Sequence, residues 1–196
     1  MDLIIASNNK DKVRELKNIL SKYFSNIYSL SDKEIDIEIE ETGNTFEENA
    51  LIKSRTIRDL TGCASLGDDS GLVVDALNGA PGVYSARYAG EDCNYINNQI
   101  LLLKNLKNEK NRKAHFETCV ALSLPNGKDF TATGITRGRI LEEPIGGNGF
   151  GYDAVFFSDT LQMSFAQATM EEKNKISHRA NALSNLLPVL NRELKK

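Results

Sequence analysis

The sequence Leu66-Gly67-Asp68-Asp69-Ser70-Gly71-Leu72 sets two adjacent carboxylates between short apolar runs. Cys63–Leu66 is typical of a strand, and Ser70-Gly71 is expected to break that strand before an extended run resumes at Leu72. Neighbouring side chains in a strand point to opposite faces, so the two acids can share a face only if the backbone turns, as Gly71 would permit. Acids at a strand end suit a divalent cation; a turn that bonds its own backbone is the alternative.

The chain begins with the pattern of a strand, a polar turn and a helix. Leu3–Ala6 is apolar like a buried strand, and Asn9 is a good N-cap for the helix that follows. Such a turn presents backbone N–H groups to which phosphate can bind, and Lys10 and Lys12 add positive charge. The glycines and the GK[ST] ending of a Walker A loop are absent. A capped helix with solvated lysines explains the same residues.

An alternating acidic segment and a capped helix come next. Apolar and acidic residues alternate over Ile35–Ile39, which predicts a half-buried strand at a sheet edge. Thr45–Glu48 fits a capping box at the start of a helix. Glu41 precedes this helix, and Asn49 and Lys53 share one of its polar stripes. The three side chains could hold a metal and a phosphate, or be ordinary surface residues.

Two later segments have the composition of ordered, ligand-binding loops. Gly79–Gly90 sets small residues around two tyrosines and an arginine, and loops of this length are usually functional. Pro144–Asp153 contains four glycines that would let the backbone approach a ligand, while Phe150 and Tyr152 offer flat faces for stacking a base. A flexible hairpin with core aromatics is the alternative interpretation.

The remaining periodicity completes an α/β pattern. A helix is expected over residues 94–105, and two long strands over 114–124 and 129–140 are joined by a turn at Pro125-Asn126-Gly127. His115 has no predicted partner at helical or strand spacing, so a packed or surface role is expected for it.

A final helix is expected after Ser177, a good N-cap. His178 and Arg179 would then lie in its first turn, where cations oppose the helix dipole, so a functional reason for the pair gains weight.

Composition limits the classes of function. A chain of 196 residues is expected to form one domain, residues 1–196, and a net charge of −3 provides no basic field for nucleic acid or an anionic membrane. Cys63, Cys93 and Cys119 form no CxxC pair, which argues for a reduced, cytoplasmic environment without a disulfide framework or zinc site. The start of the chain lacks the pattern of a signal peptide, and no apolar run approaches the roughly 20 residues that span a bilayer.

Taken together, these segments supply acidic metal ligands, a phosphate-binding turn with lysines, an aromatic glycine-rich pocket and a His-Arg pair. Those are the parts of a magnesium-assisted enzyme that acts on a nucleoside polyphosphate. No Ser-His-Asp or Cys-His set is evident, so a covalent intermediate is not expected.

Six motifs occur in a fixed order between Ser7 and Arg179. They are Ser7-x-Asn9-x-x-Lys12, Glu41-x-Gly43-x-Thr45-Phe46-x-Glu48-Asn49-Ala50-x-x-Lys53, Asp68-Asp69-Ser70-Gly71-Leu72, Gly79-Ala80-Pro81-Gly82-Val83-Tyr84-Ser85-Ala86-Arg87-Tyr88, Phe150-Gly151-Tyr152-Asp153 and Lys173-x-x-x-x-His178-Arg179. This series resembles the inosine triphosphate pyrophosphatase family in its bacterial form, the non-standard purine NTP pyrophosphatases (XTP/dITP diphosphatases). The chain departs from the family at Ser7, where threonine is frequent, and at Ala154, where proline is common.

The resemblance implies an elongated mixed sheet flanked by helices, with two lobes, a central cleft and a homodimeric assembly. It implies hydrolysis of ITP, dITP and XTP to the monophosphate and pyrophosphate, with Mg²⁺ required. By the same resemblance Asp69 is the proton acceptor and a metal ligand, Glu41 is the second metal ligand, and Asp68 supports them. The substrate-binding residues that it implies are Ser7, Asn8, Asn9, Lys10, Asp11, Lys12, Lys53, Ser70, Phe150, Gly151, Tyr152, Asp153, Lys173, His178 and Arg179.

Lys173, His178 and Arg179 make chemical sense as readers of the base. Hypoxanthine and xanthine carry an acceptor oxygen at C6, where adenine carries an amino donor, and a hydrogen-bonding site discriminates between the two far better than an apolar pocket. Two other functions remain open: a pyrophosphatase for modified pyrimidine nucleotides, and a catalytically inactive nucleotide sensor with the same fold.

Overall fold

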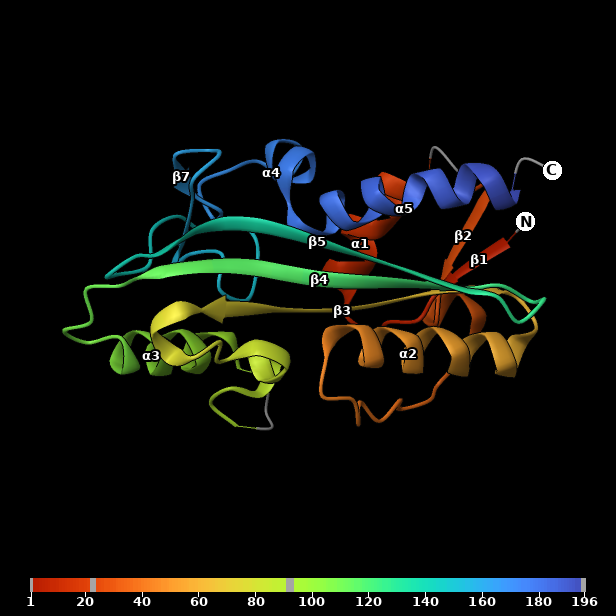
Figure 1. Cartoon of the computed structure of the whole chain (residues 1–196), viewed down its shortest axis with the longest axis horizontal. Coiled ribbons are helices and arrows are strands. Elements are labelled where there is room, and N and C mark those ends of the chain that lie inside the picture. Colours follow the sequence, from red (N-terminus) through yellow and green to blue (C-terminus); the bar gives the residue numbers. More distant parts are fainter. Residues whose placement is uncertain (1, 22–23, 91–93, 195–196) are drawn as a thin grey trace. The chain divides into compact units, whose positions relative to one another are not determined.

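The computed structural model describes residues 2–21, 24–90 and 94–194, which form a seven-stranded sheet flanked by helices (Figure 1). The strand order is β2-β1-β3-β4-β5-β6-β7. The strands are β1 (Asp2–Ile5), β2 (Asn26–Ser29), β3 (Ala64–Val74), β4 (Lys113–Ser123), β5 (Asp129–Ile140), β6 (Phe156–Ser158) and β7 (Met163–Ser164). The helices are α1 (Lys10–Leu20), α2 (Phe46–Thr61), α3 (Tyr95–Asn105), α4 (Met170–Ile176) and α5 (His178–Leu194), with 3₁₀ turns η1 (Ser31–Lys33), η2 (Asp75–Leu77) and η3 (Gly82–Arg87).

The sheet is mixed, which confirms the predicted α/β class. Strand β1 pairs in parallel with both β2 and β3, whereas β6 pairs antiparallel with β5 and β7. The central cleft and elongated outline implied by the family resemblance stay predictions. The chain forms two compact units, and each has a core of its own.

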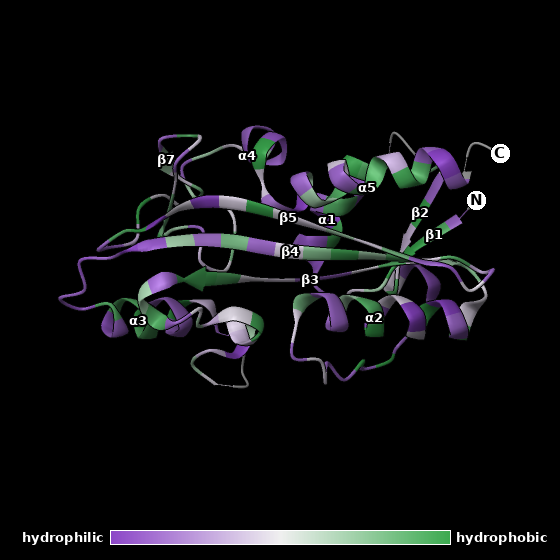
Figure 2. Cartoon of the chain, in the orientation of Figure 1, coloured by the Kyte–Doolittle hydropathy of each residue, from purple (hydrophilic) through white to green (hydrophobic). Residues whose placement is uncertain are grey.

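Unit 1 consists of Met1–Asp69, Thr118–Gly134 and Arg179–Lys196. Strand β1 is buried on both faces: Leu3 and Ile5 join one apolar cluster, and Ile4 joins another. Helices α1 and α5 cover the first cluster, and α2 covers the second from the opposite side (Figure 1). Hydrophilic and hydrophobic residues alternate along α2 and α5 (Figure 2), as expected for helices that bury one face.

Unit 2 consists of Ser70–Glu117 and Ile135–His178. Its core is rich in aromatic rings, because Phe116 packs against Phe156 and Phe165 with ring centroids 4.7 and 5.8 Å apart. The 3₁₀ turn η3 is tied to this core, since the Ser85 hydroxyl accepts a hydrogen bond from the Leu72 amide. The long loop predicted over Gly79–Gly90 is therefore ordered and partly helical.

Local signals in the sequence predicted several elements correctly. Asn9 caps α1, and Thr45 forms the expected capping box with Glu48 at α2. The helix expected over 94–105 is α3, which begins at Tyr95 with Asn94 as its N-cap. The 113–140 hairpin is also confirmed, because the Leu124 amide donates to the Lys128 carbonyl at 2.8 Å across the predicted turn.

Two predictions about strands were wrong, and one helix was missed. Strand β3 continues through Ser70-Gly71 without a break; glycine is needed there because a Cβ on Gly71 would lie 2.2 Å from the Gly82 carbonyl oxygen. The Ile35–Ile39 segment alternates in burial as predicted but forms no strand, since its isoleucines pack on unit 1 without a ladder partner. Helix α4 was not predicted, although a second capping box, between Thr169 and Glu172, marks its start.

His115 and the cysteines complete the comparison with the sequence. His115 does have a partner at strand spacing, because its Nε2 lies 3.4 Å from Oε2 of Glu117. Cys63 and Cys119 are free thiols, and Cys93 lies outside the described residues. In the described part of the chain, no helix has the length and apolar character required to cross a membrane.

Candidate active site

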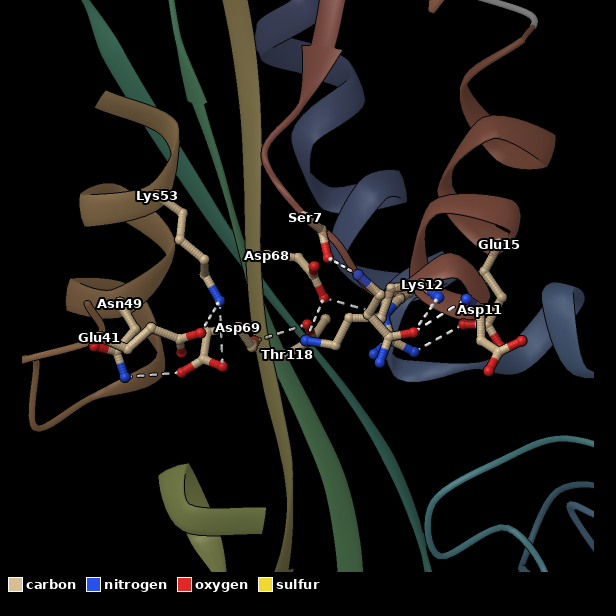
Figure 3. A network of polar contacts seen from close by, with 12 residues as sticks. Ser7, Asp11, Lys12, Glu15, Glu41, Asn49, Lys53, Asp68, Asp69 and Thr118 are labelled. Atoms are coloured by element: carbon tan, nitrogen blue, oxygen red, sulfur yellow. Dashed lines mark hydrogen bonds and ion pairs between the residues drawn. The ribbon is translucent and has the colours of Figure 1, made fainter. Parts of the chain in front are cut away.

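The two adjacent acids of β3 point to opposite faces of the strand (Figure 3). Because β3 does not turn between them, Asp69 extends toward α2 and Asp68 extends toward α1. Both carboxylates are buried, with exposed fractions of 5% and 1%. The predicted turn that would bring both acids to one face is therefore absent, and each acid has its own set of partners.

On the first face, Asp69 lies beside Lys53, Asn49 and Glu41. Lys53 Nζ is 3.6 Å from Asp69 Oδ1 and 3.2 Å from Glu41 Oε1, so one ammonium group bridges the two carboxylates. The Asn49 amide donates to Asp69 Oδ2 at 3.0 Å. Helix α2 supplies Asn49 and Lys53 from successive turns of one face, as their spacing of four predicted.

Burial raises the pKa of Asp69 above its ordinary value, even though Lys53 and Lys12 act in the opposite direction. The raised pKa means that the local cations do not fully offset the cost of burying this negative charge. An added cation would reduce that cost, and it would also relieve the repulsion between Asp69 and Glu41.

The Glu41 and Asp69 pair fits a magnesium ion. Among the described residues no group of three His, Cys, Asp or Glu side chains could hold a metal by itself. Mg²⁺ does not require such a cage, because it usually binds through one or two carboxylates, water and the phosphates of its substrate. Glu41 and Asp69 supply two carboxylates, which matches this mode of Mg²⁺ binding.

On the second face, Asp68 takes part in a buried network of charges. Its Oδ2 lies 3.4 Å from Lys12 Nζ and accepts a hydrogen bond from Arg179 Nε at 3.2 Å. A further nitrogen of Arg179 donates to Glu15 Oε2 at 2.7 Å. Arg179 and Glu15 are 2% and 4% exposed, so α1, β3 and α5 are joined through paired charges inside unit 1.

The network shifts the pKa values of its members in different directions. Burial alone would raise the pKa of Asp68, but Lys12 and Arg179 outweigh it and hold that pKa well below its usual range. Burial lowers the pKa of Lys12, and the negative charge of Asp68 offsets only part of that effect. Asp68 is therefore an anion at neutral pH, with its pKa shifted in the direction opposite to that of Asp69.

In the turn before α1, side chains of the turn itself accept hydrogen bonds from the backbone amides at the start of the helix. Asn9 Oδ1 accepts from the backbone amides of Asp11 and Lys12 at 3.0 and 3.2 Å, and Ser7 Oγ accepts from the Asn9 amide at 3.2 Å. This turn therefore offers fewer backbone amides to a phosphate than the sequence predicted. The exposed Lys10 and the half-buried Lys12 lie beside it as cations.

Unit 2 brings together Lys173 and the Phe150–Asp153 segment. Lys173 Nζ lies 2.7 Å from Asp153 Oδ2, and the same oxygen accepts from the Phe150 amide at 2.9 Å. The ammonium group is also 4.9 Å from the centroid of the Phe150 ring. The Tyr95 ring of α3 lies 6.1 Å from that ring. This cluster has an aromatic face and a cation fixed by a buried carboxylate.

Two predicted members of the base-binding set are core residues of unit 2. Tyr152 is 4% exposed and donates its hydroxyl to the Ser85 carbonyl at 2.8 Å, so in this structure its ring offers no face for a base. The neighbouring Gly151 carbonyl accepts from Gln99 at 2.6 Å. His178 begins α5 as predicted, is 3% exposed and stacks on Phe116 with centroids 4.9 Å apart.

The remaining predicted residues divide between the units. Arg179 belongs to the charged network of unit 1 rather than to the cluster around Lys173. Ser70, the half-buried residue that follows Asp69 in β3, belongs to unit 2, and Asn8 is exposed in the turn before α1.

Sequence reasoning missed Glu15 and Thr118. Glu15 lies three residues after Lys12, on the same face of α1, and that spacing could have identified it. Thr118 donates its hydroxyl to the Asp69 carbonyl at 2.9 Å, a contact that depends on the position of β4 beside β3 and has no local signal.

Comparison with known proteins gives a consistent result over nearly the whole chain. The Ham1 family matches residues 3–189. A dITP/XTP pyrophosphatase of Thermoanaerobacter pseudethanolicus is 50% identical over 95% of this chain and 94% of its own, and one of Bacillus licheniformis is 48% identical over 96% and 97%. The structure of the Staphylococcus aureus Ham1 protein is similar with a TM-score of 0.88 and 40% identity, over 98% of this chain and 100% of that one.

Proposed function

The chain belongs to the Ham1 family, and we propose that it hydrolyses ITP, dITP and XTP to the monophosphate and pyrophosphate. The observation that carries the proposal is the convergence of Glu41 and Asp69 on Lys53, which provides metal ligands and a phosphate-binding cation in one place. The names of the relatives support two of these substrates, dITP and XTP.

The cofactor in this proposal is Mg²⁺, held by Glu41 and Asp69. When bound, it would neutralise charge on the triphosphate and on the pyrophosphate that leaves. Asp69 accepts a proton from the attacking water, and Oδ2 of its carboxylate accepts a hydrogen bond from the Asn49 amide. Lys53 and Lys12 hold phosphate oxygens, so charge that develops on them meets fixed cations.

In this proposal, the cluster of Lys173, Asp153 and Phe150 recognises the base. Lys173 would donate to the C6 oxygen of hypoxanthine or xanthine, and Asp153 keeps the ammonium group in position. Phe150 would stack on the base. Tyr152 would take part in base binding through its backbone atoms. His178 would contact the base through its ring nitrogens. The contacts of Arg179 favour a role in organising Asp68 over direct contact with the base.

Residues 1–196 are proposed to act as a single pyrophosphatase domain, in a homodimer and in the cytoplasm. The free thiols of Cys63 and Cys119 favour a reducing compartment. Light scattering coupled to size-exclusion chromatography tests the assembly, since a monomeric mass at micromolar concentration would contradict the dimer. Fractionation of the cells tests the location.

The deciding experiment measures pyrophosphate release, with Mg²⁺, from ITP, XTP, dITP, ATP and GTP side by side. We expect fast release from the first three and poor release from ATP and GTP. Equal rates on all five would retain the hydrolase and reject the base-reading role of Lys173. Orthophosphate in place of pyrophosphate would mean that a different bond is cleaved, and it would reject the mechanism.

A further inference from the structure

We propose that Asn49 is a positioning residue that aligns the two metal-binding carboxylates, a role that rests on the proposed function. Its side-chain amide makes two hydrogen bonds in opposite directions. Nδ2 donates to Asp69 Oδ2 at 3.0 Å, and Oδ1 accepts from the Gly43 amide at 2.8 Å. Asn49 is 2% exposed, so both bonds are shielded from water.

The bond to Gly43 depends on a very close approach of the backbone. A Cβ on Gly43 would lie 2.6 Å from Asn49 Oδ1 and 2.6 Å from Glu48 Cβ, so any side chain at this position would push the segment away from α2. The next two amides, of Asn44 and Thr45, donate to Glu48 Oε2 at 2.7 and 3.1 Å. The first turn of α2 thus fastens residues 43–45, and Asn49 continues this attachment to Asp69.

Glu41 needs such an attachment because it lies on no helix or strand. Its side chain is 34% exposed, whereas that of Asp69 is 7% exposed and comes from a central strand. A metal site requires its ligands to be held in a narrow range of geometries. Asn49 provides that constraint with a neutral donor, so it adds no negative charge beside Asp69 and Glu41.

The test compares three variants by a measurement that does not depend on turnover. Mn²⁺ is the probe for the metal site, and its binding without nucleotide is followed by electron paramagnetic resonance. Loss of a group that orients a metal ligand typically weakens affinity by about 10- to 100-fold. We therefore expect Asn49→Ala to weaken Mn²⁺ binding in that range, and Gly43→Ala to act in the same direction with Asn49 still present.

Thr45→Ala is the matched control. It removes the side-chain acceptor that caps the Glu48 amide at 3.1 Å, so it loosens the same turn of α2 without touching Asp69. We expect it to lower the unfolding temperature while Mn²⁺ affinity stays within about twofold of wild type. In turnover assays, Asn49→Ala should raise the apparent KM for Mg²⁺ more than it lowers kcat at saturating Mg²⁺.

Wild-type Mn²⁺ affinity in Asn49→Ala or in Gly43→Ala would overturn the proposal, as would an equal loss in Thr45→Ala. A wild-type protein that binds no Mn²⁺ would also overturn it. Normal metal binding without pyrophosphate release would instead count against the proposed reaction alone. If Asn49→Ala does not fold, Gly43→Ala still decides, because it keeps every polar side chain of the site.

Discussion

At the scale of single residues, one step along β3 separates two carboxylates with opposite electrostatic environments. Asp68 lies among cations that lower its pKa, whereas burial raises the pKa of Asp69. A strand places consecutive side chains on opposite faces, so the two acids meet different helices. This division suits a structural anion next to a carboxylate that can exchange protons.

Asp69→Asn should remove most turnover and keep nucleotide binding. Loss of a general base typically costs about 10²- to 10⁴-fold in kcat. Because its folded pKa is raised, the charged form of Asp69 lowers stability at pH 7, so the amide should not destabilise the metal-free protein. Pyrophosphate release, ITP affinity and thermal unfolding test the three parts. Near-wild-type turnover would exclude Asp69 from the mechanism.

Asp68→Asn should instead destabilise the folded chain at neutral pH. It leaves the buried Arg179 and the half-buried Lys12 with one anion fewer, and breaking a buried pair such as that of Asp68 with Arg179 typically costs about 3–5 kcal/mol. Glu171→Gln, which affects only an exposed pair with Lys175, should leave the unfolding free energy nearly unchanged.

The cost of Asp68→Asn should also depend on pH. The folded pKa of Asp68 is lowered, so its stabilising contribution is complete above the ordinary value of 3.8 and is lost as the pH falls through the folded pKa. In urea unfolding, the difference in unfolding free energy between wild type and variant should be constant from about pH 7 to pH 5. It should become smaller below pH 3.8. A gap that stays constant to pH 2 would contradict the assigned role.

At the scale of helices and strands, the sequence predicts those features that depend on residues close by in the chain. The caps at Asn9, Thr45 and Asn94 act on amides two or three residues away, and all three helix starts follow from the local pattern. The unbroken course of β3 through Gly71 could not be predicted, because it depends on the Gly82 carbonyl in another segment. The burial of Tyr152 likewise depends on its partner at Ser85.

The glycine-rich segment offers a direct test of the Lys173 cluster. Gly149 has φ +77°, and a Cβ on it would lie 2.1 Å from Asp153 Oδ2. Gly149→Ala should therefore displace Asp153 from Lys173, with backbone strain of about 1–3 kcal/mol. A displaced reacting or binding group can cost on the order of 100-fold, so we expect a large rise in KM for ITP and a weaker preference over ATP.

Gly147→Ala is the control for this substitution, since a Cβ on Gly147 would have no atom within 4 Å. Steady-state kinetics with ITP and ATP should show wild-type values for Gly147→Ala. Equal effects of the two substitutions would indicate that the whole segment is sensitive, and that Asp153 does not anchor Lys173.

At the scale of the whole molecule, each compact unit has its own cluster of buried charged side chains. Unit 1 holds the acids and lysines suited to metal and phosphate, and unit 2 holds the aromatic and cationic group suited to a base. Both sets of residues lie within the six motifs of the sequence. Their assignment to units could not be predicted, because His178 and Arg179 are adjacent in sequence yet belong to different units.

Hydrogen exchange can test whether one nucleotide engages both clusters. With Asp69→Asn, Mg²⁺ and ITP, we expect slower exchange over residues 7–12 and 41–53 of unit 1 and over 149–153 and 170–178 of unit 2. Inorganic tripolyphosphate lacks a base, so with Mg²⁺ it should protect the unit 1 segments alone. Protection of the unit 2 segments by tripolyphosphate would mean that they respond to phosphate, and the assignment of Lys173 and Phe150 to the base would then be wrong.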